Sequence, residues 1–124
     1  MDHNRLTNDV LALHGDIRFS GICDRTGRII YGGYREGVTP LLSSEEEQKS
    51  NLLALERWRL YDSLAPKMGK IRYTLEDYEK VKTATIALPD QHLLLVSLEV
   101  DSDHDRIINK IIRKILTQYV ADFL

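Results

Sequence analysis

Apolar residues recur along the chain with two different periods, and the changes of period mark eight elements. Leu6, Val10 and Leu13 lie three or four residues apart, which predicts an amphipathic helix. From Ile17 the period changes to two, which predicts a strand with Ile17 and Phe19 on the same side. The expected helices cover residues 3–14, 43–67 and 103–122, and the expected strands begin at residue 17 and cover 28–34, 71–75, 80–88 and 92–100.

The segment GICDRTGRIIYGG, residues 21–33, predicts a β-hairpin. Asp24 suits the first position of a type I turn, because its carboxylate can accept backbone N–H groups two residues further on. Gly27 can then adopt a positive φ without steric cost. A phosphate-binding loop would need its glycines to lead into a helix, and here a strand follows. Asp24 and Gly27 are therefore expected to form a structural turn.

The last expected strand, residues 92–100, is apolar on both faces. It should therefore lie at the centre of a sheet that is covered on both sides. The order of elements is α-β-β-α-β-β-β-α. This order predicts an α/β fold in which helices pack on both faces of one five-stranded, mostly antiparallel sheet.

Composition narrows the class of protein without naming a function. The chain has 124 residues, of which 43% are hydrophobic and 29% charged, and this suits one globular domain over residues 1–124. A net charge of −2 produces no field that would draw the chain to nucleic acid or to an anionic membrane. The single cysteine and the polar N-terminal segment predict a cytoplasmic protein.

Residues that could carry catalysis or hold a metal show no supporting pattern. Cys23 lies inside a strand, where a buried apolar role is more common than a nucleophilic one. His3, His14, His92 and His104 lack the spacing of metal ligands on one helix or loop. The acidic residues around His104 are expected to cap the following helix, because its positive end favours carboxylates. We therefore expect no enzyme activity, no metal and no cofactor.

The helix over residues 43–67 carries more apolar surface than one contact with a sheet requires. At about 100° per residue, its main apolar face is expected to cover the sheet. This face consists of Leu53, Leu60, Leu64 and Met68, extended by Ala54, Trp58, Tyr61 and Ala65. Leu52 and Leu55 lie on the opposite side, which indicates a second contact, although scattered exposed leucines are also normal. The expected dimer or partner interface consists of Leu52, Leu55, Arg57, Trp58, Arg59 and Tyr61, which include residue types enriched at interface hot spots.

The order of elements is similar to that of the roadblock/LC7 domain, which is related to the longin and profilin folds. Residues 21–30, GICDRTGRII, resemble the first hairpin of that family. The Gly32-Gly33 pair and the segment Tyr78–Lys82 resemble a family of small archaeal proteins. The resemblance implies dimerisation through the middle helix and the third strand, and a scaffolding role without catalysis. The long polar loop Arg35–Ser44 departs from typical roadblock domains.

Two functional hypotheses follow from these observations. The first is a non-enzymatic scaffold or regulatory module that forms a homodimer and binds a protein partner, with a small GTPase as the candidate partner. The alternative is a small-molecule sensor of PAS or profilin-like type, with its ligand between the sheet and the loop Arg35–Ser44. Neither hypothesis predicts binding to nucleic acid or to a membrane.

Overall fold

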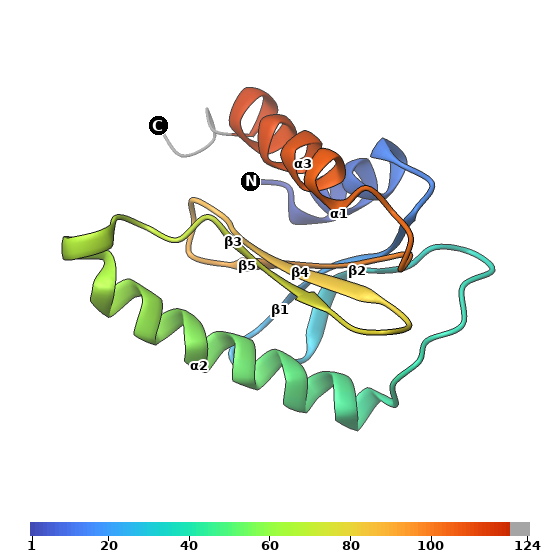
Figure 1. Cartoon of the computed structure of the whole chain (residues 1–124), viewed down its shortest axis with the longest axis horizontal. Coiled ribbons are helices and arrows are strands. Elements are labelled where there is room, and N and C mark those ends of the chain that lie inside the picture. Colours follow the sequence, from blue (N-terminus) through green and yellow to red (C-terminus); the bar gives the residue numbers. More distant parts are fainter. Residues whose placement is uncertain (120–124) are drawn as a thin grey trace.

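Three helices and five strands follow one another in the predicted order in the computed structural model, which describes residues 1–119 (Figure 1). The helices are α1 (His3–Leu13), α2 (Ser44–Met68) and α3 (His104–Gln118), and the strands are β1 (Ile17–Cys23), β2 (Ile29–Tyr34), β3 (Tyr73–Asp77), β4 (Lys82–Ala87) and β5 (Leu93–Leu98). Residues 120–122, which the sequence predicted as the end of the last helix, lie outside the described residues. The structure confirms the α/β fold class.

The five strands form one sheet in the order β2-β1-β5-β4-β3, and every neighbouring pair is antiparallel. The apolar strand β5 occupies the centre, as predicted, and five of its six residues are buried. Strand β3 begins and ends two residues later than predicted, and its turn to β4 is closed by a hydrogen bond from the Tyr78 N–H to the Val81 carbonyl at 3.0 Å. Strands β2 and β3 are the two edges of the sheet.

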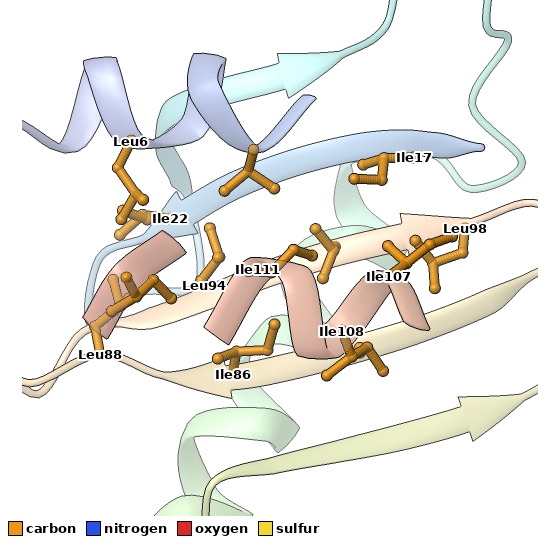
Figure 2. Close-up of a cluster of buried hydrophobic side chains, with 14 of the residues drawn as sticks. Leu6, Ile17, Ile22, Ile86, Leu88, Leu94, Leu98, Ile107, Ile108 and Ile111 are labelled. Atoms are coloured by element: carbon orange, nitrogen blue, oxygen red, sulfur yellow. The ribbon is translucent and has the colours of Figure 1, made fainter. Parts of the chain in front are cut away.

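The helices divide between the two faces of the sheet. Helices α1 and α3 lie together on one face, and the long helix α2 crosses the other face (Figure 1). The main core lies under α1 and α3, where the isoleucines of α3 stack over the strands and Leu6 of α1 lies beside Ile22 of β1 (Figure 2). Its buried members are Leu6, Val10, Ile17, Ile22, Ala84, Ile86, Leu88, Leu94, Val96, Leu98, Ile107, Ile108, Ile111, Ile115 and Tyr119.

Strand β1 does not alternate as strictly as its sequence predicts. Ile17 and Ile22 both belong to the core under α1 and α3, whereas Phe19 lines the space under α2. The prediction that Ile17 and Phe19 share a face was therefore wrong. The physical reason is an irregularity in the pairing of β1 with β5 between these two residues, which changes the side that faces the core.

The predicted hairpin joins β1 to β2. The Asp24 carboxylate accepts hydrogen bonds from the backbone N–H groups of Thr26 at 2.8 Å and Arg28 at 3.2 Å. The hydrogen bond from the Thr26 hydroxyl, with these backbone contacts, holds the pKa of Asp24 below its ordinary value. Gly27 has a φ of 82°, which is the conformation expected of it. The turn is thus built by Asp24 and Gly27, and no helix follows it.

Arg35 at the start of the loop after β2 secures the end of α1. Its guanidinium donates hydrogen bonds to the carbonyl groups of Ile17 at 2.8 Å and His14 at 2.7 Å, and also to that of Leu11. Carbonyl groups at a helix C-terminus lack partners within the helix, so the arginine supplies them. A side chain that is committed to these contacts is not available as a surface charge for nucleic acid.

Candidate protein-binding surface

Helix α2 carries the candidate surface, and its first turn is capped as the sequence predicts. Ser43 and Glu46 form a capping box, in which each side chain accepts a hydrogen bond from the other residue's backbone N–H, at 3.2 and 2.9 Å. Glu45, Glu46 and Glu47 place negative charge at the positive end of the helix dipole. The helix continues through Pro66 to Met68, and Gly69, whose φ is 82°, is its C-cap residue.

Two hydrogen bonds attach the N-terminal part of α2 to the β1–β2 hairpin. The Gln48 side-chain amide donates to the Thr26 carbonyl and the Asn51 amide donates to the Gly27 carbonyl, each at 2.9 Å. A Cβ at Gly27 would lie 2.7 Å from the Gln48 carbonyl oxygen and 3.0 Å from Leu52 Cγ. The glycine therefore allows the hairpin and the helix to approach closely.

The side of α2 that faces the sheet is set by Ala54 and Trp58, which are its two buried residues. The Trp58 ring meets Tyr61 edge-on, with 5.4 Å between ring centroids. Trp58 is only 8% exposed, so most of its surface is already covered within the chain. Of the six residues predicted at the interface, Trp58 is buried against the sheet, Leu55 and Tyr61 are half-buried, and Leu52, Arg57 and Arg59 are exposed.

The centre of the apolar face that was expected to cover the sheet is instead open to solvent, whereas the edge of that face at Ala54 and Trp58 is buried. Leu53, Leu60, Leu64 and Met68 are 53%, 57%, 41% and 79% exposed. We call these four residues the exposed stripe. The prediction that they cover the sheet was wrong, because the helix is rotated about its axis so that Ala54 and Trp58 point inward. Arg57 lies within the stripe and is itself exposed.

Leu52 and Leu55 lie on the other side of α2, next to the hairpin. Together with the hairpin turn they form a groove of 480 Å³, which we call the hairpin groove. The residues that line it are Arg25, Lys49, Leu52, Leu53, Leu55, Glu56 and Arg59. Leu52 is 42% exposed because the turn at Gly27 covers part of it. The groove combines an apolar floor with charges at its rim, a pattern typical of surfaces that bind other proteins.

A cavity of 580 Å³ separates α2 from the sheet. The aromatic rings of Phe19 and Tyr34 lie on its sheet side, with 4.8 Å between ring centroids. The Tyr34 hydroxyl donates a hydrogen bond to the Glu47 carboxylate on α2. Burial, followed by this contact with Glu47, raises the pKa of Tyr34. Leu41 and Leu42 from the loop after β2 line the same cavity.

Cys23 is 4% exposed, and burial raises the pKa of its thiol. We expect the native protein to resist alkylation by iodoacetamide near neutral pH and to react fully in denaturant, because only the thiolate is nucleophilic. Mass spectrometry of the intact protein after a timed reaction measures the labelled fraction. Labelling of the native protein as fast as of the denatured protein would contradict this placement of the side chain.

No protein-family model matches the sequence, and no curated protein matches it. Solved structures do match. The roadblock/LC7 domain from Streptomyces avermitilis aligns with a TM-score of 0.63 at 12% identity, over 93% of this chain and 95% of that chain. The chain has the roadblock/LC7 fold.

The chain is also similar to two further solved structures. The gliding protein MglB from Thermus thermophilus aligns with a TM-score of 0.60 at 13% identity, over 88% of this chain and 84% of that chain. MglC from Myxococcus xanthus aligns with a TM-score of 0.57 at 13% identity, over 91% of this chain and 92% of that chain. Identities this low establish the fold, and the roles of individual residues must come from this chain.

Sequence reasoning missed the exposed stripe as a surface, although it identified the four residues as one helical face. The signal that could have corrected it is small size at the inward positions: Ala54 and Ala65 allow a helix to approach a sheet closely. Among residues 1–119 of the chain, no helix is both long and apolar enough to cross a membrane.

Proposed function

We propose that the chain is a non-enzymatic scaffold or regulatory module that forms a homodimer through α2 and binds a protein partner. The observation that supports this proposal is the exposed stripe, where four large apolar side chains have no partner surface within the described residues. Contiguous apolar surface of this kind marks interaction sites on soluble proteins. The roadblock/LC7 fold supports it further, because one MglB structure of this fold is described as having a tetrameric arrangement.

A second copy of the chain is the occupant that best suits the exposed stripe. In a twofold contact, each residue near the axis is used twice, so four apolar residues supply eight buried side chains. Antiparallel packing of two α2 helices would bring the acidic start of each helix, Glu45–Glu47, towards the C-terminal end of the other helix, where Lys67 lies. Such charges at the rim set the orientation of the helices and contribute little affinity.

The hairpin groove shares Leu53 with the exposed stripe, and its part around Leu52 and Leu55 then remains available to a different protein. Arg25 and Arg59 flank Leu52 and Leu55 there, and arginine beside an apolar anchor is a frequent hot-spot arrangement. A small GTPase is the partner class that the resemblance to roadblock/LC7 domains implies. In this proposal the dimer presents two such grooves, one from each copy.

Binding to small GTPases from the source organism, each loaded with GDP or with a non-hydrolysable GTP analogue, tests the partner proposal. We expect at least one GTPase to bind the wild-type protein in one nucleotide state, and Leu52→Glu with Leu55→Glu to weaken this binding. The matched control is Leu60→Glu with Leu64→Glu, which leaves the groove unchanged. Equal binding by the wild type and the groove variant would contradict the assignment of the groove.

The cavity between α2 and the sheet favours a second candidate function, a small-molecule sensor. Its volume of 580 Å³ is within the range of ligand pockets, and Leu41 and Leu42 place the loop after β2 beside it. Native mass spectrometry of the purified protein distinguishes the two functions. A bound small molecule that is lost on denaturation would support the sensor, and the mass of the bare chain or its dimer would support the scaffold.

A further inference from the structure

Three potential metal ligands from distant parts of the sequence meet beside the start of α1. His3 is the first residue of α1, and Asp90 and His92 belong to the turn between β4 and β5. Their ligand atoms all lie within 4.8 Å of one another. His3 Nε2 is 2.6 Å from Asp90 Oδ2, and His92 Nδ1 is 3.1 Å from the same oxygen. Residue spacing could not reveal this cluster, because 87 positions separate His3 from Asp90.

The second oxygen of Asp90 holds the carboxylate in place. Asp90 Oδ1 accepts a hydrogen bond from the backbone N–H of His92 at 3.1 Å, which leaves Oδ2 directed at the two imidazoles. The His3 ring stacks on Tyr31, with 5.1 Å between ring centroids, so its orientation is also restrained. Partners that orient the ligands in this way are typical of metal sites in proteins.

The contacts within the cluster leave one ligand atom without a hydrogen bond. His92 Nδ1 is buried and has no hydrogen-bond partner, because its approach to Asp90 lacks hydrogen-bond geometry. A buried polar atom without a partner is costly, and a metal ion would use its lone pair. The His92 side chain as a whole is 40% exposed, so an ion can reach the cluster from solvent.

We propose that His3, Asp90 and His92 form a binding site for a divalent transition-metal ion of the zinc class. Imidazole and carboxylate ligands suit zinc and its neighbours, and two histidines with one carboxylate leave a fourth position for water. Ligand atoms around a tetrahedral zinc ion lie about 3.4 Å apart, so the Asp90–His3 contact would open by less than ~1 Å to admit the ion. The bound ion would fasten the start of α1 to the β4–β5 turn.

Calorimetric titration of Zn²⁺ into untagged, chelator-treated protein tests this site. We expect one ion to bind per wild-type chain, and His3→Gln and His92→Gln to lower the affinity at least ~10-fold each, because removing a direct ligand costs no less than removing an outer partner. The matched control is His14→Gln, because the His14 ring accepts a hydrogen bond from the Asp16 backbone N–H at 3.0 Å and, among residues 1–119, belongs to no cluster of three potential ligands. This control should bind zinc as the wild type does.

Two further readouts make the outcome decisive. Zinc should raise the unfolding temperature of the wild type and of His14→Gln, and should leave that of His3→Gln unchanged. Cobalt bound to the wild type should show the visible absorption of a four-coordinate ion. Failure of the wild type to bind zinc stoichiometrically overturns the proposal without any variant, and so does equal affinity in His3→Gln, His92→Gln and His14→Gln.

Discussion

Replacing Gly32 by alanine should destabilise the domain by roughly 3–5 kcal/mol, or prevent folding, because two penalties act at one position. Gly32 has a φ of 85°, a conformation that residues with a Cβ rarely adopt. A Cβ there would also lie 2.1 Å from the Ser20 carbonyl oxygen and 2.9 Å from the Gly21 Cα. Both are backbone atoms of the paired strand β1, so neither can move aside alone. Urea denaturation followed by circular dichroism measures the free energy of unfolding.

Gly33 provides the matched control for this prediction. It is the next residue of the same strand, and a Cβ there would meet nothing within 4 Å. We expect Gly33→Ala to change the free energy of unfolding by no more than ~0.5 kcal/mol. Equal stability of Gly32→Ala and the wild type would show that β1 and β2 do not pair as closely as the Gly21–Gly32 register requires.

Replacing Leu60 and Leu64 with glutamate should convert the proposed dimer to a monomer without unfolding the chain. Burying one leucine contributes about 1.5–3 kcal/mol. In a twofold contact, each substitution removes one leucine from each of the two copies. The dissociation constant should therefore rise at least ~100-fold. The fold should persist because both side chains are 41–57% exposed in the single chain. Sedimentation velocity over a concentration series measures the effect, with circular dichroism as the folding control.

Leu52→Glu with Leu55→Glu is the matched variant, because it adds the same charges to the same helix on the side of the hairpin. We expect this variant to remain a dimer and to lose affinity for the partner protein. The sequence alone predicted the opposite, a dimer contact at Leu52 and Leu55. A monomer from this variant, together with a dimer from Leu60→Glu with Leu64→Glu, would favour the sequence-based interface and contradict the exposed stripe.

Local chemistry made most of the fold predictable. The Asp24–Gly27 turn, the Ser43–Glu46 capping box and the apolar strand β5 each depend on residues close together in the sequence. Short-range hydrogen bonds and steric limits act on such residues directly, so their pattern carries the information. The order of elements then restricted the architecture to helices on both faces of an antiparallel sheet.

The candidate sites were harder to predict because they depend on how elements meet. The rotation of α2 about its axis is set by Ala54, Trp58 and the hydrogen bonds to the hairpin, and apolar periodicity alone favoured the more hydrophobic face. The side-chain reversal in β1 comes from its pairing with β5. The contact between His3 and Asp90 joins the first helix to a turn near the other end of the chain. None of these contacts can be recognised from residues that are close together in the sequence.

Disulfide trapping at Leu60 tests most directly whether the exposed stripe is where a second copy packs. The native cysteine, Cys23, is buried and should form no disulfide between chains. A covalent dimer of Leu60→Cys therefore reports on the stripe alone. We expect mild oxidation to convert Leu60→Cys to a covalent dimer, because residues near the centre of an antiparallel twofold contact approach their own copies. Asn8→Cys, exposed on α1 across the sheet, should stay monomeric on a denaturing gel. No covalent dimer from Leu60→Cys, or equal dimer from both variants, would contradict packing of a second copy on the stripe.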